Sequence, residues 1–433
     1  MKNILIRFTL LGAIFSTAVV QTGCKKDFVN PNAATDEQVF STPKGLTGVV
    51  VGLQRVYTLG RGSTLYNLIN INGLTTNELI VVNPGNTAEV QLAAGGTTVD
   101  GNNTMLTTFW TSCNKVIYDA NKVIASATGL ADKNYASGLI AYASIFKALS
   151  IGDMAQFWEK VPSTTGTNVT FIDRIDGFKQ AITVIDNALA AISANAISSA
   201  FTANVPAGID ILNTLYALKA RYSLFAGLYA QALTNANLVD LTKKSTFNFD
   251  ALSLNPVFET ATSTNNVVQP KDSTLGLATP LQPALNDGRI LFYTSINPTI
   301  LPRYRINGFC NAAGTAFPVY LPGEITLIKA EAYARAGTPD LVNGLIELNK
   351  VVTKTTDPFG VNANQPAIVS VSGQAELLDQ IYRHRSIELF MSGLKLEDMR
   401  RFNRPNSEKK RNLMPYPLRE RDNNPNTPPD PVF

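Results

Sequence analysis

The stretch "QAELLDQIYRHRSIELFMSGLKLEDMRRF", residues 374–402, decides how this chain is interpreted. It predicts a long helix, a break at Gly393 and a short second helix, because glycine adopts the left-handed conformation that ends a helix at little cost. Apolar residues at helical spacing give the long helix one stripe, made of Leu377, Leu378, Ile381, Leu389 and Phe390. We therefore expect this helix to be buried against other helices.

Two charged residues lie on the same stripe. Arg385 follows Ile381 by four residues, and Glu388 follows Arg385 by three. Buried charges must be paired, since an unpaired one is very costly, and the short helix supplies Asp398 and Arg401 as partners. We interpret Arg385, Glu388, Asp398 and Arg401 as structural ion pairs. A catalytic site is the alternative, but no nucleophile or metal-ligand set accompanies these charges.

The motif "RHRSIELFMSGLKLEDMRRF" resembles the C-terminal signature of the SusD/RagB family, the surface nutrient-binding lipoproteins of Bacteroidetes-type bacteria. Three further stretches resemble the same family: "WTSCNKVIYDANKVI", "PGEITLIKAEAYARAG" and the tail "NLMPYPLRERDNNPNTPPDPVF". The resemblance implies a mainly α fold of tetratricopeptide-like helical hairpins with long loop-rich decoration. It implies no cofactor.

The N-terminus predicts export and lipid attachment. Residues 1–23 are typical of a signal peptide, with early positive charges and an apolar run too short for a comfortable membrane span. They end in "QTG" before Cys24, which resembles a bacterial lipoprotein cleavage site and predicts lipidation of Cys24. The alternative is an ordinary signal peptide with cleavage elsewhere. We expect a lipid anchor and tether over 24–42 and a single SusD-like helical domain over 43–433.

Composition excludes several functions. A net charge of +4 with 16% charged residues is too weak for a nucleic-acid partner. His384 is the only histidine, which argues against a histidine triad or a multi-histidine metal site, and we predict no metal. Cys113 and Cys310 could form a disulfide or remain unpaired thiols, and the sequence leaves both open.

Helical periodicity recurs along the chain. It predicts helices over 43–57, 136–157 and 171–193, and one around Trp110, whose ring we place in the core rather than against a ligand. Two stretches predict tetratricopeptide-type hairpins, "LYALKARYSLFAGLYAQALTNANLV" and "EITLIKAEAYARAGTPDLVNGLIELNKVV". A single hairpin cannot bury its apolar face, so several must stack.

Two regions, 75–104 and 243–320, lack periodicity, and loops this long are usually functional or disordered. Aromatic rings cover the apolar side of a sugar ring while polar side chains bond its hydroxyls. Our candidate ligand contacts are therefore Asp287, Arg289, Tyr293 and Tyr304. The alternative is that such aromatics pin the loops onto the helices. Residues 67–108 contain no aromatic residue, which leaves open a smaller ligand, a peptide or a site built from the later loops.

The resemblance implies a function. It implies an outer-membrane, surface-exposed lipoprotein that captures a glycan or oligosaccharide and delivers it to a SusC-like TonB-dependent β-barrel transporter. A peptide-binding uptake protein and a surface scaffold are the alternatives. We predict no enzyme, although paired carboxylates such as Glu324 with Glu331, or Glu388 with Asp398, would suit a hydrolase if they faced one another across a cleft.

Overall fold

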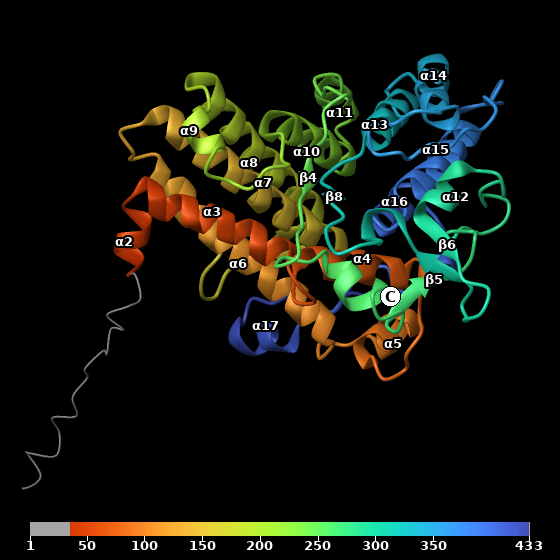
Figure 1. Ribbon diagram of the computed structural model, residues 1–433, viewed down its shortest axis with the longest axis horizontal. Helices are drawn as coiled ribbons and strands as arrows, with labels where there is room; N and C mark the ends of the chain where they lie inside the picture. The colour runs from red at the N-terminus through yellow and green to blue at the C-terminus, as the bar shows by residue number, and fades with distance from the viewer. Residues whose placement is uncertain (1–34, 433) are drawn as a thin grey trace, which may run out of the picture. The chain divides into compact units, whose positions relative to one another are not determined.

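The principal helices of this protein pack side by side (Figure 1). The computed structural model describes residues 35–432, so the predicted signal peptide, Cys24 and most of the tether lie outside the described residues. The chain divides into residues 1–39 and 40–433, and the described end of the first part begins helix α2 (Asp36–Phe40). The principal helices are α3 (Pro43–Thr58), α6 (Thr104–Ala127), α7 (Lys133–Phe157), α8 (Arg174–Ala194), α10 (Ile211–Phe225), α11 (Tyr229–Ala236), α13 (Pro322–Ala334), α14 (Leu341–Val352) and α15 (Gln374–Glu388).

The predicted fold class is confirmed. The fold is mainly α-helical, and both predicted hairpins form, one from α10 and α11 and the other from α13 and α14. They stack on each other through α11 and α13, and α15 then packs on α13 and α14. This stacking buries the apolar face that neither hairpin could bury alone.

Polar side chains set the starts of these helices. Asp132, Asp210 and Asp340 each accept a hydrogen bond from a backbone N–H in the first turn, of α7, α10 and α14 respectively. Among the described helices, α7 is long and apolar enough to cross a membrane, but 89% of its most apolar window is buried inside the protein. Such extensive burial is typical of a central core helix, and α7 has that position here.

Further helical segments connect these principal helices. They are α4 (Thr64–Thr75), α5 (Thr87–Ala94), α9 (Ser199–Thr202), α12 (Gly288–Tyr293), α16 (Lys395–Arg401) and α17 (Leu418–Asn423), with the turns η1 (Gly96–Thr98), η2 (Phe258–Thr262), η3 (Gly308–Cys310) and η4 (Asn406–Glu408). The sequence did not predict α4, because all of its residues are buried and it shows no polar face. Helix α5 lies within 75–104. It buries only Glu89 and Leu92, so its sequence shows no apolar periodicity.

The described residues form four two-stranded antiparallel sheets, three of which lie in the loop-rich regions. The pairs are β1 (Leu79–Val81) with β5 (Val268–Pro270), β2 (Lys160–Pro162) with β3 (Phe171–Asp173), β4 (Thr246–Phe247) with β8 (Phe317–Pro318), and β6 (Thr294–Ile296) with β7 (Tyr304–Ile306). In the first sheet Ile80 lies opposite Gln269, so the region 75–104 is hydrogen-bonded to the region 243–320.

The helix at 374–402 differs from its prediction in one detail. Helix α15 ends at Glu388, and Leu389 and Phe390 already lie in the following turn. Met391 and Gly393 both have positive φ angles, +57° and +82°, so the chain reverses before the glycine as well as at it. Gly393 is required for a second reason, because a Cβ there would lie 2.5 Å from Cγ of Leu68.

Candidate functional site

Arg385 lies at the centre of a buried ion-pair cluster that joins α13, α15 and α16. Its Nε and Nη2 donate to the two carboxylate oxygens of Asp398 at 2.9 and 3.0 Å. Arg401 donates to the same carboxylate at 2.5 Å and also pairs with Glu331. Burial alone would raise the pKa of Asp398, but the charges of Arg385 and Arg401 hold that pKa below its usual value. The cluster therefore fixes three helices and exposes no reactive group.

Glu388 belongs to a second, neighbouring cluster. Its carboxylate accepts hydrogen bonds from Arg289 at 3.2 Å and from Lys354 at 2.5 Å. Arg289 is fully buried and is also held by both carboxylate oxygens of Asp287, at 2.9 and 2.7 Å. His384 Nδ1 lies 3.0 Å from Nη2 of Arg289. Burial, and then the charge of Arg289, lower the pKa of His384 well below its usual value, so the ring is neutral and accepts.

Three of the four predicted ligand contacts lie in this second cluster. Asp287, Arg289 and Tyr293 are all buried, and the Tyr293 hydroxyl donates to the backbone oxygen of Glu388 at 2.5 Å. Tyr293 also packs edge-on against Phe390, with ring centroids 5.6 Å apart. Tyr304 lies on β7, in the β6–β7 hairpin, outside this cluster. The contacts of Asp287, Arg289 and Tyr293 hold the loop-rich region against α15. That any of the four residues contacts a ligand stays a prediction.

The carboxylates considered for hydrolysis are each held by a cation. Glu324 accepts from Nε and Nη2 of Arg221 at 2.6 and 2.7 Å, and both side chains are buried. Glu331 pairs with Arg335 at 2.9 Å and with Arg401. Two carboxyl groups opposed across an open cleft, as glycoside hydrolysis needs, are therefore not formed by these residues.

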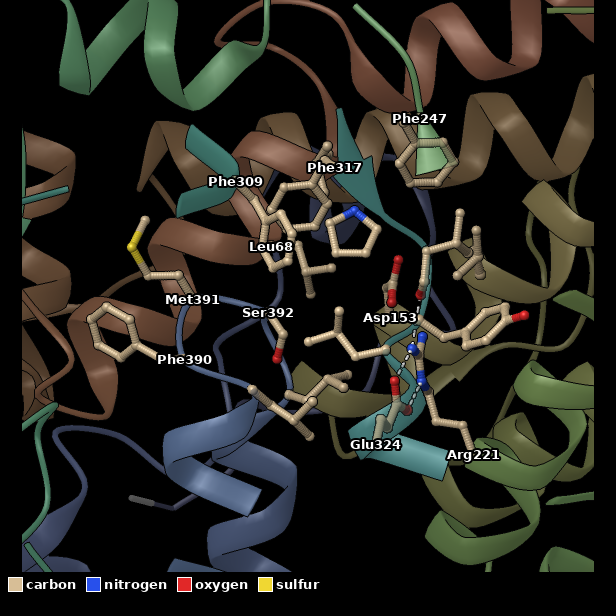
Figure 2. Close-up of a pocket in the computed structure, with 18 of the residues that line it drawn as sticks. Leu68, Asp153, Arg221, Phe247, Phe309, Phe317, Glu324, Phe390, Met391 and Ser392 are labelled. Atoms are coloured by element: carbon tan, nitrogen blue, oxygen red, sulfur yellow. Dashed lines mark hydrogen bonds and ion pairs between the residues drawn. The ribbon is translucent and has the colours of Figure 1, made fainter. Parts of the chain in front are cut away.

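A cavity lies beside the Arg221–Glu324 pair, and Figure 2 shows these two side chains facing Asp153. Its other walls are apolar and aromatic, with Phe247, Phe309, Phe317 and Phe390 among them (Figure 2). Its volume is about 40 Å³, which is room for water molecules but not for a sugar ring. Burial raises the pKa of Asp153 to about 7, although the Tyr57 hydroxyl donates to it at 2.7 Å. This cavity belongs to the packing of the core.

A larger, more open groove follows the β1–β5 sheet. It measures about 500 Å³, within the range of ligand pockets. Its wall is mostly aliphatic, with Ile80, Val81 and Val90 partly exposed, and its charges are the exposed Lys271 and Lys410. None of the described residues that line it is aromatic. Residues from both loop-rich regions line this groove, and it is the candidate ligand site.

Gly95 allows the C-terminal segment to complete the groove. Its φ angle is +72°, and a Cβ there would lie 2.3 Å from the backbone oxygen of Lys410. The same oxygen accepts a hydrogen bond from the N–H of Gly96 at 3.0 Å, and the N–H of Lys410 donates to Thr75 at 2.8 Å. Backbone hydrogen bonds with Gly96 and Thr75 thus hold Lys410 at the groove.

No protein-family model matches this sequence, and no curated protein matches it. Solved structures do match the fold. A crystal structure of a SusD superfamily protein from Bacteroides vulgatus has a TM-score of 0.69 and 11% sequence identity, covering 91% of this chain and 100% of that chain. This chain has the SusD fold. The predicted resemblance is therefore confirmed for the fold.

Two further solved proteins with the SusD fold carry functional descriptions. One is described as a putative sugar binding protein from Bacteroides vulgatus, with a TM-score of 0.70 and 14% identity over 90% of this chain and 98% of that chain. The other is described as a SusD-like carbohydrate binding protein from Bacteroides fragilis, with a TM-score of 0.66 and 15% identity over 84% and 87%.

Several polar residues of the buried SusD-fold core were not predicted. Asp153 and Arg221 lie in the otherwise apolar helices α7 and α10, and Lys354 follows α14. A charged residue inside an apolar helical run is the signal that could have identified the first two. Lys271 and Lys410 had no such signal, because each lies in an irregular, exposed segment. Cys113 and Cys310 are both buried and free.

Proposed function

We propose that this protein is a surface-exposed lipoprotein that binds a glycan and delivers it to a SusC-like TonB-dependent β-barrel transporter in the outer membrane. The observation that carries the proposal is the SusD fold, which solved proteins described as sugar or carbohydrate binding share over 84% and 90% of the chain. The proposal assigns no chemical step to the protein.

In this proposal the N-terminal residues provide the anchor. Removal of residues 1–23 leaves Cys24 as the lipidated first residue, and 24–42 connect the lipid to the helical domain. The charged residues that follow the cysteine, Lys25 to Asp27, resemble the tag that directs such lipoproteins to the cell surface.

The β1–β5 groove is the proposed glycan site. Its aliphatic wall can cover the apolar face of a sugar ring, and Lys271 and Lys410 can donate hydrogen bonds to ring hydroxyls or carboxylates. A peptide is the second candidate ligand, because the groove offers aliphatic side chains and cations but no aromatic ring.

Two experiments test the proposal. The first is purification of this protein from gently solubilised native outer membrane, followed by identification of its partners and of the lipid on Cys24. A large β-barrel transporter as the main partner supports the uptake function. Its absence, with Cys24 lipidated, favours a surface scaffold instead.

The second experiment measures binding of glycans and peptides to the purified protein by calorimetry. Val90→Asp places a charge on the exposed apolar wall of the groove, where Val90 is 36% exposed. Val369→Asp is the matched control, because Val369 is 93% exposed and does not line the groove. Loss of ligand binding in the first variant alone supports the groove, and equal binding in both contradicts it.

A further inference from the structure

Helix α6 carries a second hollow, away from the β1–β5 groove. It measures about 450 Å³ and lies between α6, the loop that joins β2 to β3, and Glu420 of α17. Trp110, Asn114 and Tyr118 line it from α6 at intervals of four residues, so they share one face of that helix. Thr164 lines it from the loop.

This hollow combines an exposed ring with hydrogen-bonding groups. Tyr118 is 44% exposed, whereas Trp110 is buried and donates from Nε1 to Oε2 of Glu420 at 3.1 Å. Asn114 donates from Nδ2 to the backbone oxygen of Trp110 at 3.0 Å, so its Oδ1 can accept a hydrogen bond from another group. An exposed aromatic ring beside amides and hydroxyls matches the two faces of a sugar ring, one apolar and one polar.

A deeper pit adjoins the hollow. The two share Asn114, Pro162 and Thr164 in their walls, and the pit has a volume of about 80 Å³. Lys147 lines it from α7, and the remaining polar lining comes from Asn121, Ser163 and Gln180. The pit is therefore larger than a single water molecule needs, and its polar groups share the wall with apolar residues, among them Ile117, Ile151 and Met154.

Lys147 is the unusual residue of this pit. It is partly buried, and among residues 35–432 it has no ion-pair or hydrogen-bond partner. Burial lowers the pKa of its ammonium group, and no carboxylate offsets that effect. The buried arginines Arg221, Arg289 and Arg385, by contrast, are each paired with a carboxylate. A partly desolvated cation without a protein partner is less favourable than a paired one, and an anion bound in the pit would offset that difference.

We propose that this hollow binds an acidic saccharide, with one sugar ring against Tyr118 and its carboxylate or sulfate in the pit against Lys147. The volume of the hollow accommodates the sugar, and the pit selects for the anionic group. The site is separate from the β1–β5 groove, so it adds a second ligand site to the proposed function and does not depend on the first.

The test is calorimetric titration of the full-length lipoprotein in detergent with galacturonate trimers, with their methyl esters and with a sulfated disaccharide. The trimer tests the carboxylate and the disaccharide tests the sulfate, while the ester keeps the sugar and removes the charge. We expect binding of at least one acidic probe and a loss of about tenfold or more on esterification, as for a charge-assisted hydrogen bond. Trp110 fluorescence should change in the same titration, because its indole lines the hollow.

Two variants complete the test. Lys147→Met keeps an unbranched side chain as far as Cε and removes the ammonium group, and we expect it to weaken binding of the acidic probe about tenfold or more. Lys133→Met, at the exposed start of the same helix and outside the hollow, the pit and the β1–β5 groove, is the matched control and should leave this binding unchanged. Equal binding by the Lys147→Met protein overturns the proposal. So does the absence of millimolar binding by every acidic probe, or equally tight binding of free inorganic sulfate, which would show an anion pit without sugar recognition. Circular dichroism verifies that both variants fold.

Discussion

Gly323 at the start of α13 touches the carboxylate of Glu388 at the end of α15, since a Cβ on Gly323 would lie 1.9 Å from Oε1 of Glu388. This approach lets the Glu388 carboxylate reach Arg289 and Lys354 at once. The glycine therefore acts through its lack of a side chain, not through its backbone angles. It connects the second tetratricopeptide-like hairpin to the ion pairs that hold the loop-rich region.

Gly323→Ala is expected to lower the free energy of unfolding by about 1–3 kcal/mol, because the added methyl group must displace a buried carboxylate from its partners. Urea denaturation measures the change. Gly337→Ala is the matched control, since no atom lies within 4 Å of a Cβ built there. Equal stability of the two variants would contradict the close contact between α13 and Glu388.

Asp398→Asn is expected to lower the free energy of unfolding by about 3–5 kcal/mol, because it leaves Arg385 and Arg401 buried beside a neutral group. The control is Asp379→Asn, whose side chain is 60% exposed and lies 3.7 Å from Arg404. Exposed pairs of this kind contribute about 0–1 kcal/mol. Chemical denaturation of both variants at neutral pH tests the difference, and similar losses would mean that the buried cluster contributes no more than a surface pair.

The ion pairs of Asp398 should also weaken in acid. Its pKa is lower in the folded protein than its ordinary value of 3.8, so its contribution to stability is complete above that value. It is lost as the pH falls below 3.8 through the pKa of the folded state. We therefore expect the stability gap between the wild type and Asp398→Asn to shrink below that pH, as followed by urea denaturation. A gap that is constant down to pH 2 would contradict this assignment.

The sequence was most informative where apolar periodicity and charge coincide. The stripe on α15 led to Arg385 and Glu388 as buried charges, and both are buried and paired in the structure. Asp398 and Arg401 were identified by the same reasoning, since α16 follows α15 directly. The hairpin turn between α13 and α14 was visible because "GTPD" combines a flexible residue, a helix breaker and a capping aspartate.

The sequence was least informative where long-range contacts set the environment. Arg289 and Glu388 are 99 residues apart in the chain, so nothing local distinguishes Arg289 from a solvent-facing arginine in a loop. Helix α4 is buried on all sides and therefore lacks the polar face that reveals a helix. The β1–β5 groove forms from two segments that are paired only by the fold.

Asp153 should make stability decrease as the pH rises toward neutrality. Burial raises its pKa from 3.8 to about 7, so between these values the unfolded chain has lost the proton that the folded protein keeps. Asp153→Asn removes this effect, and its stability relative to the wild type should increase from pH 4 to pH 7 and then remain level. Urea denaturation of both proteins across this range measures the change. A difference that does not vary with pH would show that Asp153 ionises at its ordinary pKa.

Lys147→Met should raise the free energy of unfolding by up to about 1 kcal/mol, because it removes a partly buried cation that has no partner among the described residues. The control is Lys133→Met, at the exposed start of α7, where the ammonium group donates to the backbone of Thr128 at 2.8 Å. A ligand that binds only the folded state adds stability that grows with the logarithm of its concentration relative to its Kd, so an acidic saccharide should raise the melting temperature of the wild type more than that of Lys147→Met. A Lys147→Met protein less stable than the wild type would show that the ammonium group already has favourable contacts, and the pit would then have no need of an anion.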